Sequence, residues 1–201
     1  MCGNFALYSS IRAIKNYYKL LQKLGEIEPN HNIRPSQQVP VIVIKQRNKY
    51  LGFVRWGLIP FWAKDKKIGY KLFNARSETI DVKSSFKVAF KQRRCLIPAN
   101  GFFEWRKPDK TKFYFELKDR KLFSFAGIWE KWTDTQGNII PSCTIITCEP
   151  NEIVAPIHNR MPVILSKEDE DIWLNSNDQD KLKSLLKPYP AYLFVTRASS
   201  S

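Results

Sequence analysis

Strand-like segments outnumber helical segments in this sequence and do not alternate with them, which narrows the folds open to the chain. Eight short stretches are either continuously apolar or alternate apolar with polar residues. These stretches are residues 39–44, 50–54, 95–98, 102–105, 112–117, 122–129, 141–147 and 192–195. A chain of 201 residues is long enough to bury one substantial core. We therefore predict an α+β fold: a single domain over residues 1–201, with a largely antiparallel, partly barrel-like β-sheet core and a few flanking helices.

Helical periodicity is confined to four places. Apolar residues recur at helical spacing in Leu7–Leu24, with Ser9 or Ser10 placed to cap the helix and Gly25 placed to end it. The strongly basic segment Lys83–Arg94 has interleaved apolar residues and is expected to form an irregular helix. Near the end of the chain, Lys167–Leu174 and Asp178–Leu186 have the caps and breakers typical of two short helices.

Turns and one aromatic loop are expected between the strands. Lys45–Asn48, Asn100–Gly101 and Gln136–Asn138 have the composition of tight turns. Trp56–Trp62 is an aromatic stretch interrupted by glycine and proline, which we interpret as a loop that leaves two indoles near the surface. Such rings can plug a core, or they can form a platform on which nucleobases stack.

The charge of the chain is strongly positive, with 33 Lys and Arg residues against 19 Asp and Glu residues and a net charge of +14. This excess favours a polyanionic partner such as nucleic acid, although basic solvated faces without that role are common. No apolar run is long enough to cross a bilayer, and we expect a cytoplasmic protein. The four cysteines include no CxxC pair and are expected to be reduced and mostly buried. With two histidines in the chain and no cluster at ligand spacing, we expect no metal site.

Cys2 follows the initiator methionine and becomes the N-terminal residue if Met1 is removed. It then carries an amine and a thiol on adjacent carbons, and both titrate near neutral pH. The amine can condense with an aldehyde to a Schiff base, and the thiol can close on the imine carbon to form a thiazolidine. The alternative is that Cys2 is an ordinary small residue at a frayed terminus.

Two other residues are candidates for proton transfer. Glu104 lies in an otherwise aromatic run, Phe102–Trp105, where burial against rings would raise its pKa toward neutrality. Alternatively, strand alternation points Glu104 to solvent. His158 lies between two prolines, beside an asparagine and near an arginine, and could act as an acid or base. A histidine in such a segment can equally serve only to satisfy backbone groups.

Five motifs together resemble the SOS response-associated peptidase (SRAP) family, in the order and spacing of that family and over nearly the whole chain. They are Met1-Cys2-Gly3, Trp56–Pro60, Asn74–Thr79, Arg94–Trp105 and His158–Pro162. Members of this family shield abasic sites in single-stranded DNA. The resemblance implies the SRAP fold and a thiazolidine crosslink between the processed N-terminal cysteine and the ring-opened abasic site. It also implies a chemistry that needs no metal and no organic cofactor.

The resemblance assigns catalytic roles to four residues. Cys2 would be the nucleophile, and Asn74 would orient the cysteine and the opened sugar through its amide. Glu104 would act as general acid and base during imine formation and crosslink reversal. His158 would assist sugar ring opening and Schiff-base chemistry, and in the family it is linked to strand cleavage by β-elimination. Removal of Met1 is proposed to be autocatalytic in the family, and the alternative is a general aminopeptidase, since these also act before small residues.

The resemblance also implies a set of DNA contacts. Arg76 and Arg160 match phosphate-binding arginines. Flanking bases are expected to stack or wedge against three apolar groups, and two polar residues complete the set. The full set is Arg76, Arg160, Trp62, Trp105, Pro40, Asn4 and Thr147. Asn4 stands where family members commonly carry arginine, so one cation beside the nucleophile is replaced. The expected partner is single-stranded DNA with abasic sites, bound by a monomer.

Two other functions remain open from the residues alone. Cys2, Asn74 and His158 could serve as nucleophile, orienting group and base in a cysteine peptidase or N-terminal-nucleophile amidohydrolase. The chain could also be a single-strand DNA-binding module without catalysis, in which Cys2 is incidental. The basic surface and the aromatic loop argue against the first alternative, since neither would contribute to binding a small neutral amide.

Overall fold

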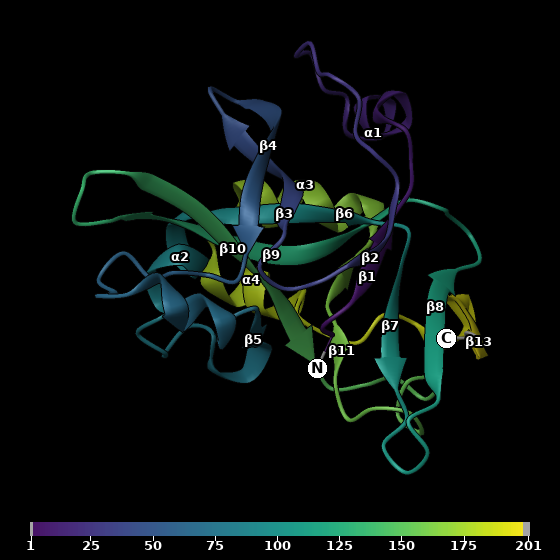
Figure 1. Cartoon of the computed structure of the whole chain (residues 1–201). Coiled ribbons are helices and arrows are strands. Elements are labelled where there is room, and N and C mark those ends of the chain that lie inside the picture. Colours follow the sequence, from purple (N-terminus) through teal and green to yellow (C-terminus); the bar gives the residue numbers. More distant parts are fainter. Residues whose placement is uncertain (1, 199–201) are drawn as a thin grey trace.

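The structure is a computed structural model that describes residues 2–198, and a closed β-barrel forms its centre (Figure 1). The barrel strands follow one another in the order β10, β4, β3, β6 and β9, and β9 pairs with β10 to close the ring. Their bounds are β3 (Gln38–Lys45), β4 (Asn48–Trp56), β6 (Arg94–Ala99), β9 (Phe123–Thr133) and β10 (Ile139–Cys148). All contacts within this ring are antiparallel except the short parallel contact between β10 and β4. The prediction of an α+β fold with a largely antiparallel, partly barrel-like core is confirmed.

A second, five-stranded sheet packs on the barrel and shares its core. Its strands lie in the order β13 (Phe194–Ala198), β8 (Lys112–Leu117), β7 (Gly101–Trp105), β1 (Phe5–Leu7) and β2 (Asn30–Ile33). Phe5 and Phe102 from this sheet both pack against Phe125 of the barrel, with ring centroids 5.7 and 6.2 Å apart. These aromatic contacts join the two sheets into one hydrophobic core.

Three short strands extend the barrel sheet at the end where β10 finishes. β5 (Asn74–Arg76) runs parallel to β10, while β11 (Met161–Pro162) pairs with it antiparallel. β12 (Ile164–Leu165) pairs with β9. Because β10 is a shared neighbour, the segments around residues 74 and 161 are brought to the same end of the barrel.

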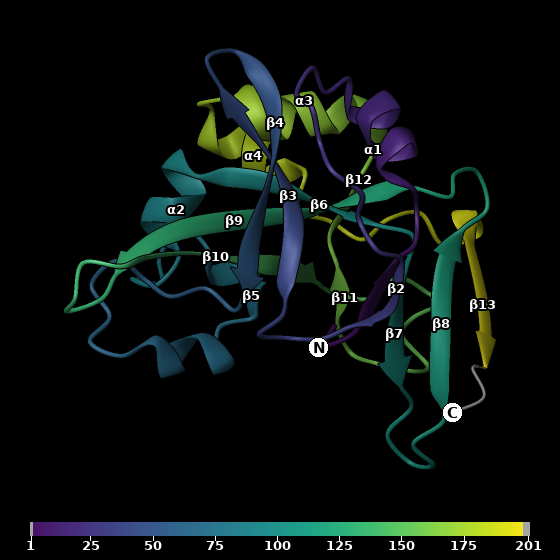
Figure 2. The same cartoon turned by 45° about the horizontal axis from the view of Figure 1, so that its top comes forward.

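Helices cover one side of the barrel, where α1 (Ile11–Tyr18), α3 (Lys167–Asn175) and α4 (Gln179–Ser184) gather (Figure 2). The N-terminal helix is shorter than its periodicity predicts. Leu7 belongs to β1, and Lys19 adopts a left-handed conformation (φ 57°) that ends the helix and leaves Leu21 84% exposed.

The basic segment is also less helical than predicted. Only α2 (Lys87–Gln92) is helical, because Arg94 already begins strand β6. The C-terminal strand is shifted as well: residues 191–193 form a 3-10 turn, and β13 begins at Phe194. The predicted turns between β3 and β4, β6 and β7, and β9 and β10 are confirmed.

One prediction about the aromatic stretch was half wrong. Trp56 is the last residue of β4, and its ring is completely buried in the core. Its indole Nε1 donates to the carbonyl of Phe73, which satisfies the one polar group of the ring. Trp62 is 46% exposed, as expected for a loop residue. The prediction that the four cysteines are reduced and buried is confirmed. Among residues 2–198, no helix has the length and apolar character needed to cross a membrane.

Candidate active site

Cys2 lies immediately before β1 and is completely buried. The Asn74 side-chain amide donates from Nδ2 to the Cys2 carbonyl oxygen at 2.7 Å, which fixes the backbone of the candidate nucleophile. Asn74 is the first residue of β5 and is held opposite Ile145 of β10. The barrel therefore positions the amide, and the amide positions Cys2. The expectations about retention and removal of Met1 concern a residue outside the described range.

Glu104 approaches Cys2 from the neighbouring strand. β1 and β7 pair antiparallel, and the backbone N–H of Phe103 donates to the carbonyl of Asn4 at 2.9 Å. Alternation along β7 turns Glu104 inward, where it is only 3% exposed. The alternative in which Glu104 faces solvent is therefore wrong. Burial raises the pKa of Glu104 to about 7, so both its protonated and ionised forms are populated at neutral pH.

The Cys2 thiol is held in its protonated form. Burial raises its pKa well above the ordinary value, and the negative charge of Glu104 raises it further. The Sγ atom lies 3.8 Å from the Asn4 carbonyl, at the distance of a weak S–H hydrogen bond. Reaction at sulfur therefore requires a base that takes the thiol proton, and the Glu104 carboxylate is close enough to interact electrostatically with it.

His158 lies in the turn before β11 with its ring facing Glu104. The distance between His158 Nε2 and Glu104 Oε2 is 3.9 Å. His158 Nδ1 lies 3.0 Å from the backbone N–H of Arg160 and 3.1 Å from the Arg160 carbonyl, so it accepts from the first in one tautomer of the neutral ring and donates to the second in the other. Burial lowers the pKa of His158, so the neutral form prevails at pH 7. The ring thus satisfies a backbone group through Nδ1 and presents Nε2 toward the carboxyl group.

These four side chains come from segments far apart in sequence and meet at one end of the barrel. The candidate nucleophile, Cys2, is surrounded by a neutral imidazole, a carboxyl group that titrates near neutral pH and an amide that fixes its backbone. Such a set can donate and accept protons at a reacting carbon without a metal ion. Within the described residues, 2–198, no cluster of three or more His, Cys, Asp or Glu side chains has the arrangement of a metal site.

Arg160 and Thr147 belong to a hydrogen-bond network beside this site. The Arg160 guanidinium bonds both carboxylate oxygens of Glu78, at 2.6 and 3.0 Å, and the carbonyl of Thr147 at 2.6 Å. The Thr147 side chain is completely buried and donates to the carbonyl of Ala75. In this arrangement the charge of Arg160 is balanced by Glu78, while Arg76, opposite Thr147 in the sheet, is exposed.

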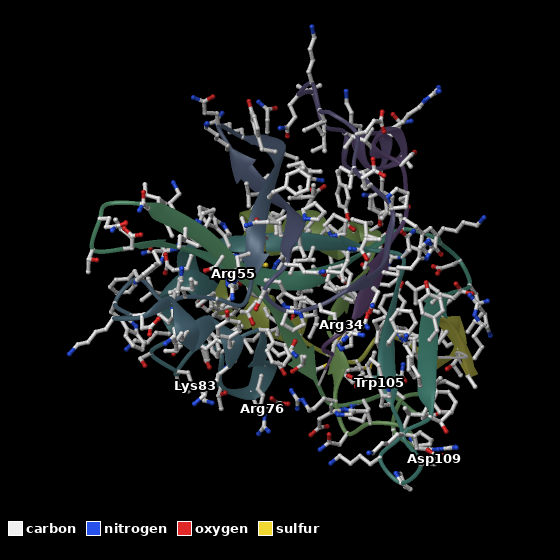
Figure 3. The ribbon with its side chains drawn as sticks, viewed as in Figure 1. Arg34, Arg55, Arg76, Lys83, Trp105 and Asp109 are labelled. Atoms are coloured by element: carbon white, nitrogen blue, oxygen red, sulfur yellow. The ribbon has the colours of Figure 1, made fainter. Side chains whose placement is uncertain are left out.

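The remaining candidates for DNA contact differ in exposure. Figure 3 shows Arg76 and Trp105 in one view, with Arg76 extending away from the ribbon of β5. Trp105 is 37% exposed at the end of β7. Pro40 is buried in β3 opposite Phe53, and Asn4 is 1% exposed. The contacts of these residues with DNA stay predictions.

The sequence reasoning missed two residues linked to Asn4. The Asn32 side-chain oxygen accepts from Asn4 Nδ2 at 2.6 Å and from Arg34 Nε at 3.1 Å. This link places the exposed cation of Arg34 next to the segment that carries Cys2 (Figure 3). Nothing in the local sequence signals it, because it depends on the pairing of β1 with β2.

Comparison with known proteins identifies a family. The family model described as SOS response associated peptidase (SRAP) matches residues 1–201. The chain is 49% identical to "Abasic site processing protein YoqW" of Bacillus subtilis, over 95% of this chain and 88% of that protein. It is 31% identical to "Abasic site processing protein HMCES" of Gallus gallus, over 75% of this chain and 55% of that protein. A crystal structure of a protein from Bacteroides thetaiotaomicron superimposes with a TM-score of 0.91 at 28% identity, covering 98% of this chain and 91% of the other. The chain belongs to the SOS response associated peptidase (SRAP) family.

Proposed function

We propose that this protein processes abasic sites in single-stranded DNA by forming a thiazolidine crosslink through Cys2. One observation carries the proposal: Asn74 bonds the Cys2 backbone at 2.7 Å while a buried carboxyl group with a pKa of about 7 lies beside the same residue. Relatives that are 49% and 31% identical bear the name abasic site processing protein, which supports the choice of substrate.

The reaction begins when hydrolysis removes Met1 and frees the Cys2 amine. The amine adds to the aldehyde carbon of the ring-opened sugar, and loss of one water molecule gives an imine. Protonated Glu104 donates the proton that lets the hydroxyl group leave as water. The nitrogen keeps one of its two amine protons, so the intermediate is a protonated imine. The Sγ atom adds to its carbon while the thiol proton passes to the Glu104 carboxylate, which gives the neutral thiazolidine and restores protonated Glu104.

His158 and Asn74 assist this sequence. In the tautomer with its proton on Nε2, neutral His158 can donate to the ring oxygen of the closed sugar, which favours the open aldehyde. The amide of Asn74 prevents the N-terminal segment from drifting away from the reacting carbon. In the other tautomer, in which Nδ1–H donates to the Arg160 carbonyl, Nε2 can remove a proton next to the imine carbon, which would lead to strand cleavage by β-elimination.

A crosslinking assay tests the proposal. The processed protein is mixed with a single-stranded oligonucleotide that contains one abasic site, and the products are separated on a denaturing gel after heating. We expect a heat-stable band without any reductant, with the mass of protein plus DNA minus one water. Retention of Met1 or the substitution Cys2→Ala should abolish the band. Strand cleavage is scored in the same gel and reports the lyase step.

A second buried thiol supplies the matched control. Cys143 is completely buried in β10, so Cys143→Ala removes a thiol while leaving Cys2 in place. This variant should crosslink as the parent protein does. A heat-stable band that persists in Cys2→Ala would refute the proposal. Turnover of a peptide library by the processed protein would instead favour the peptidase alternative.

A further inference from the structure

The outer face of the five-stranded sheet carries a cavity of about 390 Å³, which we call the outer groove. It is lined by Tyr8, His31, Phe103, Lys112, Tyr114 and Arg197. Alternation along β7 places Phe103 and Trp105 on this face, while Phe102 and Glu104 point to the opposite face. The outer groove is therefore separate from the candidate active site but shares a strand with it.

Aromatic rings form two walls of the outer groove. Tyr8 and His31 are stacked, with ring centroids 4.9 Å apart and planes inclined by 15°. Phe103 and Tyr114 face each other across the β7–β8 pair, with centroids 4.8 Å apart. Phe103 and Tyr114 are buried, at 7% and 6% exposed, whereas His31 is exposed and Tyr8 is half-buried. The Tyr8–His31 pair is therefore the part of the outer groove on which a base of a single strand can stack.

Two cations lie over these rings. Lys112 Nζ is 4.2 Å from the ring centroid of Phe103 and 5.7 Å from that of Trp105, so one ammonium bridges the outer groove and the end of β7. The Arg197 guanidinium lies 5.2 Å from the centroid of Tyr114, and its charge is partly balanced by Glu116 at 3.7 Å. Lys112 is therefore a cation that contacts both the outer groove and Trp105.

We infer that the outer groove binds nucleotides of the same single strand beyond the damaged one. Its Tyr8–His31 ring pair matches a base, its cations match the neighbouring phosphates, and the net charge of +14 favours a polyanion over other ligands. Lys112 contacts Phe103 in the groove and Trp105 at the end of β7, the residue that follows Glu104. The inference rests on the proposed function in one respect, the position of the damaged nucleotide at Cys2. Binding of the other nucleotides to the outer groove does not involve Cys2.

A binding experiment on oligonucleotides with two arm lengths tests this inference. Each strand carries a tetrahydrofuran abasic analogue, which has no aldehyde and cannot crosslink. One strand has three nucleotides on each side, and two others carry a ten-nucleotide arm on the 5′ or the 3′ side. We expect one of the long arms to tighten binding to the parent protein. Lys112→Glu should remove about 10-fold of that affinity and lower the salt dependence by roughly one to two released ions.

Lys45→Glu is the matched control. Its Nζ lies 5.7 Å from the centroid of the Tyr50 ring, so it is also a lysine over an aromatic ring, but it lies at the β3–β4 hairpin. This variant has the same net charge as Lys112→Glu and should retain the gain from the long arm. His31→Ala removes one stacked ring without changing a lysine and should weaken the same arm by several-fold.

Three results would overturn the inference. The first is that Lys112→Glu binds every strand as tightly as the parent protein does. The others are that Lys45→Glu loses as much affinity for the long-arm strand as Lys112→Glu, or that Lys112→Glu loses as much affinity for the short strand as for the long-arm strand. Failure of the proposed function is distinguished by a separate measurement. If the parent protein forms no crosslink with a true abasic site, the proposed function fails, while the arm-length dependence on the analogue still decides the groove.

Discussion

The buried carboxyl group of Glu104 should make the fold less stable as pH rises. The pKa of Glu104 is raised by burial from 4.5 to about 7. Between these values the unfolded chain loses the proton while the folded chain keeps it, so the folded state binds more protons and stability falls with pH. Below about pH 4.5 both states are protonated, and the penalty vanishes.

The size of this penalty follows from the shift. Each pKa unit corresponds to about 1.4 kcal/mol, so the full penalty above pH 7 is about 3 kcal/mol. The side chain is 4% exposed, so solvent screening reduces this figure little. Glu104→Gln keeps the shape of the side chain and cannot ionise. Relative to the parent protein, its free energy of unfolding should therefore rise by about 3 kcal/mol between pH 4.5 and pH 7.5.

Urea unfolding of both proteins at several pH values measures this difference, and groups common to both cancel. Glu78→Gln serves as a control of opposite sign. Arg160 lowers the pKa of Glu78 by hydrogen bonding, so the stability that Glu78 contributes is present above its ordinary pKa and is lost as pH falls below it. A gap between Glu104→Gln and the parent that does not change with pH would refute the reasoning about burial.

Three further outcomes are expected. Asn74→Ala loses the hydrogen bond to Cys2, so its free energy of unfolding in urea should fall by about 1 kcal/mol. The rate of crosslink formation, measured by quenched gel assays, should fall at least about 10-fold. An unchanged rate would remove Asn74 from the mechanism. Gly101→Ala places a Cβ 2.3 Å from the Tyr114 ring and should destabilise the fold by about 1–3 kcal/mol, whereas Gly25→Ala, with no atom within 4 Å, should not. Arg76→Ala should weaken single-strand binding and lower its salt slope by about one, measured by anisotropy titrations; an unchanged slope would show that Arg76 contacts no phosphate.

The strand hairpins could be predicted because their signals are local. Gln46 and Arg47 adopt positive φ values of 50° and 66°, which form the two-residue turn expected between β3 and β4. The prediction extended the N-terminal helix too far, because the strand residue Leu7 lies at a spacing that continues the helical pattern of apolar residues. Periodicity alone could not separate the two elements, since both bury their apolar residues in the same core.

The candidate site was predictable where the cause lies within a few residues. A carboxyl group in an aromatic run, such as Glu104, signals desolvation from its neighbours alone, and the structure buries it. The balance of Arg160 by Glu78 and the Asn4–Asn32–Arg34 link were not predictable. Both depend on which strands become neighbours, and that register is set by tertiary packing.

The position of β10 has a consequence for how the chain is made. This strand completes the ring with β9 before it and pairs with β11 after it, and it also pairs with β4 and β5, which lie far from it in sequence. Until the ribosome has released residues 139–148, the nascent chain exposes unpaired edges on β4 and β9 that can associate with other chains. A truncated product ending before Ile139 should therefore aggregate, and maturation of the full-length protein should be slow for its size because so many of its pairings span long loops.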